Sequence, residues 1–196
     1  SSNASTLAGL FGSVNQGTAQ LSNLTRQVRS ELVPTFAGLG LTTEQLNDFL
    51  GTFLEIQRIQ NRNQFQDQNA ATAALQNYGI EIDKIAKLTG IQREQLNEAV
   101  KAQSDDAVFQ TYLRGLTVEQ ANAQQTLVAG LTGLNPAVGD AVKNILATGF
   151  PLGEFEQTLV GTTDGLLDNI LALKNGEINT VQFTRALENS SKGFLN

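Results

Sequence analysis

Carboxylates are the groups of this chain best suited to proton transfer, because the sequence contains no His and no Cys. The common pairings of a nucleophile with a base cannot be assembled, which leaves carboxylates, Lys and Tyr. Asp105 with Asp106, and Glu81 with Asp83, come closest to paired carboxylates. Adjacent helical residues point about 100° apart, so Asp105 and Asp106 do not face each other. We expect them at a helix start, where negative charge suits the helix dipole.

Composition and motifs give little further support to catalysis or metal binding. The absence of His and Cys excludes disulfides and the usual zinc sites, and no P-loop, GxSxG, HExxH or EF-hand spacing occurs. We therefore expect no catalytic residue, no metal and no cofactor. The 13 Lys and Arg against 19 Asp and Glu give a net charge of −6, which disfavours a general affinity for phosphate backbones. We therefore expect no specific nucleic-acid binding.

Length and hydrophobic content are those of a folded chain without a membrane span. A chain of 196 residues that is 40% hydrophobic can bury a core, and it fits one domain or two small ones. Its apolar runs are far shorter than the roughly 18 residues needed to cross a bilayer, and no secretory signal is evident. The sequence contains no Met, and we expect it to be an excerpt or processed piece of a longer protein.

Apolar residues recur every three or four positions along most of the chain, which is the period of buried helix faces. The clearest stripes are Leu46, Phe49, Leu50, Phe53 and Ile56; Val108, Phe109, Tyr112 and Leu113; Leu127, Val128 and Leu131; Val138, Ala141, Val142, Ile145 and Leu146; and Leu166, Leu167, Ile170 and Leu171. The sequence therefore predicts an all-α array of about eight to ten short to medium helices.

Residues typical of helix boundaries agree with these stripes. Capping-box pairs are expected to start helices, prolines to occupy first turns, and glycines to end helices. These residues are Thr42 with Gln45, Thr117 with Gln120, Pro136, Pro151, Gly79, Gly115, Gly149 and Gly176.

A junction between two helices is predicted within residues 82–99. Leu88 and Thr89 end an apolar helical face, and Gly90 can take the left-handed conformation that stops a helix. The next helix carries Leu96 inward, with Arg93 and Glu94 in its first turn, where Glu94 suits the dipole and Arg93 does not. We interpret these residues as a structural motif, which we call the junction motif: Leu88, Thr89, Gly90, Arg93, Glu94 and Leu96.

Residues 57–69, QRIQNRNQFQDQN, are rich in amides and poor in apolar side chains. One interpretation is a solvated continuation of the preceding helix, with Glu55, Arg58 and Arg62 along one flank. The alternatives are an amide stripe that binds a partner, and disorder, against which Ile59 and Phe65 argue.

The N-terminal region has an imperfect heptad pattern, residues 7, 14, 21 and 28 being apolar. Glycines weaken its first half, so the better segment is 21–32, and Leu21, Leu24 and Val28 form a candidate oligomer seam. The segment LAGLFGSVNQG also resembles a membrane-active peptide in its combination of glycine and apolar residues. It is short and lacks interfacial basic residues, so membrane contact is the less favoured interpretation.

These patterns divide the chain into two parts. Residues 1–34 are predicted to form the N-terminal helix with imperfect heptads, a possible coiled-coil segment, and residues 35–196 a helical domain. The helical domain could be subdivided near residues 115–135.

The segment IDKIAKLTGIQREQLNEAVKAQSDDAVFQTYLR, residues 82–114, resembles one found in many tail tape measure proteins of tailed bacteriophages. In those proteins a helix ends in a Leu-x-x-x-Thr-Gly phrase, a Ser-Arg-Glu-Glu-Leu-like helix follows, and a short helix with an aromatic residue comes soon after. Residues 85–90 match the first phrase, residues 93–96 the second, and Phe109 with Tyr112 the third. Gln92 stands where Ser is common, and Gln is a poorer N-cap.

The resemblance implies a virion component without enzymatic activity. Such a protein lies in the tail interior, sets tail length, fills the lumen and leaves ahead of the DNA, after assembly in the bacterial host cytoplasm. Its expected partners are further copies of itself and other tail proteins of the tube, tail tip or baseplate. Lys87, Thr89, Gly90, Arg93 and Glu94 would then be architectural.

Two other functions stay open. One is a different helical interaction module, either a virion-internal protein or an adaptor. The other is a cell-wall hydrolase domain that uses two carboxylates, which suffice for glycoside hydrolysis. That chemistry needs one acid with a raised pKa in a cleft, and no Glu of this sequence sits in an apolar stretch that predicts one.

Overall fold

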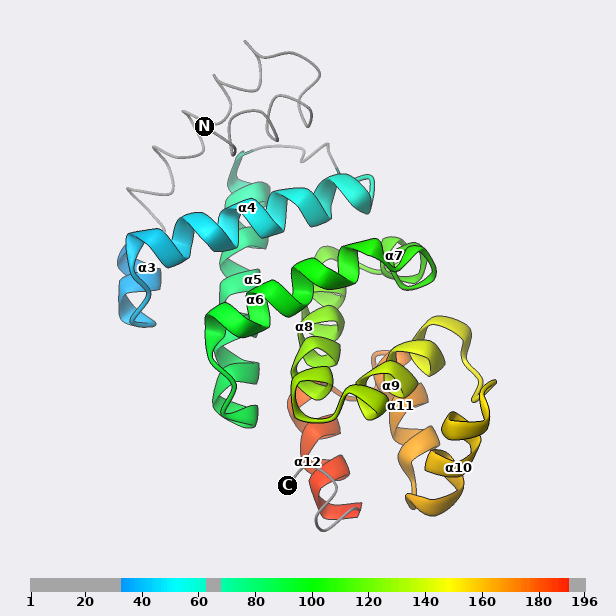
Figure 1. The fold of residues 1–196 in the computed structure, drawn as a ribbon. Coiled ribbons are helices and arrows are strands. Elements are labelled where there is room, and N and C mark those ends of the chain that lie inside the picture. The colour runs from blue at the N-terminus through cyan, green and yellow to red at the C-terminus, as the bar shows by residue number, and fades with distance from the viewer. Residues whose placement is uncertain (1–32, 63–67, 191–196) are drawn as a thin grey trace.

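The computed structural model describes residues 33–62 and 68–190, which fold into α-helices joined by short connections (Figure 1). In chain order these are α3 (Val33–Gly38), α4 (Thr43–Ile59), α5 (Gln68–Thr89), α6 (Arg93–Ala102), the 3-10 helix η2 (Gln103–Asp105), α7 (Ala107–Arg114), α8 (Val118–Leu134), α9 (Pro136–Thr148), α10 (Glu154–Thr162), α11 (Leu166–Lys174) and α12 (Thr180–Ser190). Ten α-helices and no strand occur within the two described ranges. The predicted all-α fold is confirmed.

α8 is the central helix of the described fold. It packs most extensively against α5 and α9 and also contacts α6, α7 and α12. Figure 1 shows α5 and α8 side by side, with α6 passing across them. Every residue from Gln124 to Leu131 is buried. The sequence predicted only Leu127, Val128 and Leu131 of this stretch, because buried amides have no hydrophobic period.

Most predicted stripes form the core. The stripes of α4 and α9 are buried throughout. In α7, Phe109 and Leu113 are buried, but Val108 is 64% exposed, so its predicted burial was wrong. Val108 directly precedes Phe109, and neighbouring positions on a helix point about 100° apart, which turns Val108 away from the buried face.

Several boundary predictions are confirmed. Both predicted capping boxes form, at the starts of α4 and α8. Pro136 lies in the first turn of α9, and Gly149 ends that helix with a φ of +82°. Gly115 is the C-terminal cap of α7.

Two boundary predictions were wrong. Gly79 lies in the middle of α5, where a Cβ atom would come within 2.1 Å of Phe36 Cε1. This glycine is therefore required by the close approach of a buried ring rather than by a helix end. Pro151 precedes α10 by three residues and lies in the α9–α10 connection, because Gly153 caps that helix instead.

Within the part of the chain that the structure describes, no helix combines the length and hydrophobicity needed to cross a membrane. The candidate seam residues Leu21, Leu24 and Val28 lie outside the described residues. The predicted boundary at residue 34 and the subdivision near 115–135 stay predictions, and α8 occupies most of the second range.

Candidate functional site: the junction of α5 and α6

α5 and α6 meet at Gly90, as the junction motif predicts. α5 ends at Thr89, and Gly90 follows with a φ of +74°, the left-handed conformation that favours glycine. The Gly90 N–H donates to the Ala86 carbonyl at 2.9 Å. The Thr89 hydroxyl donates to the Ile85 carbonyl at 2.7 Å and accepts the Ile91 N–H at 3.3 Å. The junction therefore pairs the N–H groups of Gly90 and Ile91 within its own residues.

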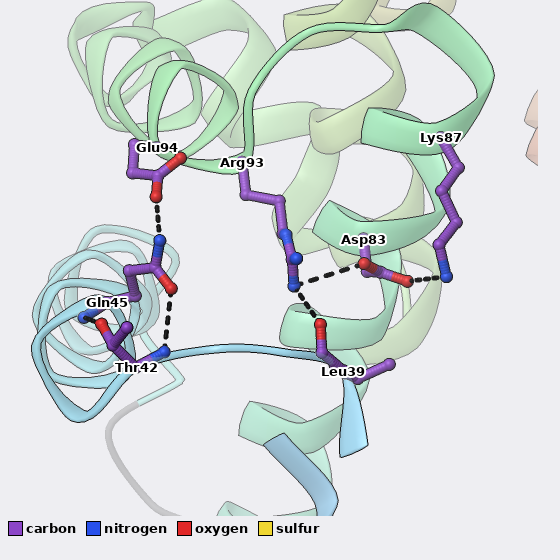
Figure 2. Close-up of polar contacts among 7 residues, drawn as sticks. All are labelled: Leu39, Thr42, Gln45, Asp83, Lys87, Arg93 and Glu94. Atoms are coloured by element: carbon purple, nitrogen blue, oxygen red, sulfur yellow. Dashed lines mark hydrogen bonds and ion pairs between the residues drawn. The ribbon is translucent and has the colours of Figure 1, made fainter. Parts of the chain in front are cut away.

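Arg93, the first residue of α6, contacts both α5 and the α3–α4 connection (Figure 2). Its Nη1 atom donates to the Leu39 carbonyl, in the α3–α4 connection, at 2.5 Å. The same atom lies 3.4 Å from Asp83 Oδ1 on α5. The sequence placed Arg93 unfavourably at the positive end of a helix dipole. The Asp83 carboxylate and the Leu39 carbonyl offset that cost.

Asp83 is buried and faces two cations. Its Oδ2 atom lies 2.7 Å from Lys87 Nζ, one turn further along α5, while its Oδ1 atom faces Arg93. Glu81, also buried, pairs through Oε1 with Lys84 Nζ at 2.7 Å. The two carboxylates suggested by the sequence as a pair therefore bind different cations. A catalytic carboxylate pair would have to share a substrate site instead.

Glu94 joins the start of α6 to the start of α4. Its Oε1 atom accepts a hydrogen bond from Gln45 Nε2, as Figure 2 shows. Gln45 also closes the capping box of α4, because its Oε1 atom accepts the Thr42 N–H at 2.9 Å and its own N–H donates to Thr42 Oγ1 at 3.2 Å. One amide side chain thus serves a helix cap and a contact between two helices.

The apolar members of the junction motif face the core. Leu96 is completely buried, and Leu88 is half-buried against the same cluster. The structure therefore places all six motif residues at one junction, where α3, α4, α5 and α6 meet. Their contacts position helices, and the neighbouring Lys87 is 74% exposed in its side chain.

The second acidic pair forms a helix start, as predicted. Asp106 caps α7, with its Oδ1 atom accepting the Phe109 N–H at 3.0 Å. Its Oδ2 atom lies 2.7 Å from Lys143 Nζ on α9. Burial alone would raise the pKa of Asp106, but the hydrogen bonds from Lys143 and from the Phe109 N–H outweigh it and lower the pKa. Asp105 is exposed in η2.

The amide-rich stretch behaves differently from the sequence prediction. α4 ends at Ile59 rather than continuing, and Gln57 and Gln60 are buried. For these two residues, the predictions of a solvated face and of a partner-binding stripe were both wrong, because their side chains are buried inside the fold. Residues 63–67 of the same stretch lie outside the described residues.

Gln60 begins a network of buried amides that sequence reasoning missed. Gln60 Nε2 donates to the Oε1 atoms of Gln110 at 3.1 Å and of Gln125 at 3.3 Å. Gln125 Nε2 donates to Asn122 Oδ1 at 3.3 Å, and Asn122 Nδ2 donates to Asn77 Oδ1 at 3.1 Å. The network joins α5, α7 and α8 to the end of α4. A network of this kind specifies one packing arrangement, since an unpaired buried amide is costly.

Metal ligation has no candidate in the described ranges, where no group of three or more Asp and Glu side chains could hold a metal ion. Comparisons with protein-family models, with curated proteins and with solved structures found no match. The proposed function therefore rests on the sequence and on the arrangement of its residues in the fold.

Proposed function

We propose that this chain is a non-enzymatic structural protein of a phage virion, a piece of a tail tape measure protein. The observation that supports the proposal is the order of helices in residues 82–114, the segment that resembles that family. It forms a helix, a left-handed glycine, a second helix and a short aromatic helix, in the order that the resemblance implies.

The use of charged side chains at the junction supports an architectural role. Arg93, Asp83 and Glu94 all bind other parts of the same chain. Glu81 pairs with Lys84, and Asp83 pairs with Lys87 and Arg93, so the two carboxylates share no cation, which argues against the carboxylate-based hydrolase. On this proposal the chain lies in the tail interior, contributes to tail length and leaves during DNA ejection.

The proposed partners are further copies of this chain and proteins of the tube, tail tip or baseplate. Self-association would use the seam of Leu21, Leu24 and Val28. These residues form a narrow apolar stripe suited to a coiled coil rather than to a globular helix.

A second candidate is a helical adaptor or another virion-internal interaction module. The observation that favours it is three large apolar side chains left exposed, Phe150 and Leu152 in the α9–α10 connection and Phe155 in the first turn of α10. Exposed apolar groups of this kind are typical of protein interaction sites.

Protease protection in purified tailed particles tests the proposal. We would purify particles produced from the genome that encodes this chain and detect its peptides by mass spectrometry. A tape measure protein is expected to be present, protected from added protease in intact particles and lost after DNA ejection. Absence from the particles would overturn the virion assignment, whereas a chain accessible on intact particles would favour the adaptor.

A further inference from the structure

The α9–α10 connection and the first turn of α10 expose three large apolar side chains close together in the sequence. Phe150 is 65% exposed, Leu152 69% and Phe155 51%. We call these three residues the apolar knob. Val108, on α7, is similarly exposed at 64% but has no large exposed neighbour next to it in the sequence. The knob therefore offers a contact surface that a single exposed side chain does not.

Hydrogen bonds hold the backbone that carries the apolar knob. Thr148 Oγ1 donates to the Phe150 carbonyl at 3.0 Å. Glu156, which is buried, accepts the Gly153 N–H at 2.7 Å and Asn144 Nδ2 at 2.8 Å. These bonds fix the connection at both ends. Binding to an ordered surface costs less conformational entropy than binding to a loose one.

The charge around the knob selects its partner. Residues 144–173 contain Glu154, Glu156, Asp164 and Asp168 but no Lys or Arg. Glu154 is exposed and directly precedes Phe155. An apolar partner with positive charge is therefore complementary to this surface, and an anionic lipid surface is repelled by it.

Residues 21–32, LSNLTRQVRSEL, have that chemistry. Leu21, Leu24 and Val28 share one face of a predicted helix, and Arg26 and Arg29 supply positive charge against a single Glu31. The seam of the N-terminal region is thus apolar and basic, as the knob requires.

The geometry of the described fold favours a second copy as the source of this segment. Residue 32 directly precedes α3, which packs against α5, whereas α10 packs against α9. Figure 1 shows α3 and α10 at opposite sides of the described fold, with α5, α6 and α8 between them. Docking on the knob of the same copy would require the segment to cross from one of these sides to the other, whereas docking on a second copy does not.

We propose that the apolar knob binds residues 21–32 of a second copy of this chain. The inference rests on the proposed self-association and specifies its contact, in which the seam of one copy meets the knob of the next. Because the two surfaces differ, the association is head-to-tail and extends beyond a dimer unless a ring closes.

Sedimentation velocity of the full chain over a range of concentrations tests this contact. We expect oligomers that grow with concentration. Leu152→Ser and Phe155→Ser should each weaken association about tenfold or more, as should Leu24→Asp. Val108→Ser is the matched control, since it removes an equally exposed apolar side chain away from the knob, and it should leave association unchanged. Circular dichroism verifies that each variant is folded.

A charge exchange makes the test specific. Arg29→Glu should weaken association, because it places negative charge near Glu154 of the next copy. Adding Glu154→Arg should restore association, because the two exchanged charges attract each other again. A peptide of residues 18–34, added in excess, should dissociate the oligomers. Association that is lost in Leu24→Asp but unchanged in both knob variants would show that seams pair with seams, which overturns this inference and leaves the proposed self-association intact. A chain that is monomeric at every concentration would overturn both.

Discussion

Arg62 and Arg114 bind the ends of each other's helices. Arg114, the last residue of α7, donates from Nε at 3.0 Å and from Nη2 at 2.5 Å to the carbonyl of Ile59, which ends α4. Arg62, just beyond α4, donates from Nη2 to the carbonyls of Leu113 at 2.7 Å and Leu116 at 2.6 Å, at the end of α7. Each positive side chain thus lies at the negative end of the other helix.

Arg62→Met should lower the free energy of unfolding by about 1 to 3 kcal/mol, because it leaves the carbonyls of Leu113 and Leu116 without this donor. Arg62→Lys should recover only part of that loss, since one ammonium group cannot also reproduce the bond from Nε to Gln60 Oε1 at 3.0 Å. Urea unfolding followed by circular dichroism measures both values. Arg58→Met, which alters an exposed arginine of α4, is the control and should change stability by less than about 0.5 kcal/mol. Equal effects at positions 58 and 62 would contradict the reciprocal capping.

The left-handed conformation of Gly90 predicts an order of stabilities. No atom lies within 4 Å of a Cβ built at this position, so a substitution meets backbone strain alone. Gly90→Val should cost on the order of 1 to 2 kcal/mol and Gly90→Ala less, while Asn tolerates this conformation better than either. Thermal and urea unfolding provide the values.

Gly161 is the matched control for Gly90. A Cβ there also meets nothing within 4 Å, and this residue lies in the last turn of α10 without a positive φ. Gly161→Ala should therefore be neutral or stabilising by up to about 1 kcal/mol. Gly161→Val should cost less than Gly90→Val. Equal costs for the two Val variants would contradict the interpretation of Gly90 as a helix junction.

Arg93 and Lys87 contact the same carboxylate but should contribute unequally. Arg93 is 26% exposed and also binds the Leu39 carbonyl, whereas Lys87 is 74% exposed. Arg93→Met should cost about 1 to 3 kcal/mol, and Lys87→Met less than about 1 kcal/mol. Hydrogen exchange in the α3–α4 connection should accelerate only in the Arg93 variant. Unchanged exchange there would show that Arg93 does not hold this connection.

The Asp106–Lys143 ion pair predicts a dependence of stability on pH. The folded state lowers the pKa of Asp106 below its usual 3.8, so the pair's contribution is present above the usual value and is lost as pH falls through the folded one. The folded state raises the pKa of Lys143 above its usual 10.5, so the contribution is present below the usual value and is lost as pH rises through the raised one. Between these limits the pair should be intact.

Asp106→Asn isolates the charge of the pair, because Asn still caps α7. At neutral pH we expect the variant to be less stable by about 0.5 to 1 kcal/mol, a value that partial exposure keeps small. The difference should shrink toward zero below the lowered pKa of Asp106. A difference that stays constant from pH 7 to pH 2, in urea titrations, would indicate that the charge is not responsible.

Hydrophobic period and capping residues predicted the helices of this fold well, but they did not predict its buried polar contacts. Thr42 with Gln45 and Thr117 with Gln120 form the predicted boxes, because capping depends on residues three apart in the sequence. The buried bond of Gln60 to Gln125 joins residues 65 positions apart. The residues near Gln60 and Gln125 in the sequence form no pattern that shows whether these amides are buried or solvated. Gly79 was misread for a similar reason, since its requirement comes from the distant ring of Phe36.

The junction motif was predictable as a junction but not in its contacts. Gly90 and Leu96 follow from local conformation and helical period. The bonds of Arg93 to Leu39 and of Glu94 to Gln45 depend on how α4 lies across α6, which no local pattern specifies. Those two bonds explain why charged residues occupy the first turn of α6.

Tail length, measured against the length of the parent chain, tests the proposed function most directly. We would insert about 30 helix-forming residues ahead of residue 1 in the reading frame that encodes this chain, and measure tails of the resulting particles by electron microscopy. If the chain is part of a tape measure protein, tails should lengthen by about 45 Å, at about 1.5 Å for each helical residue. Tails of unchanged length in particles that contain the longer chain would contradict the proposal.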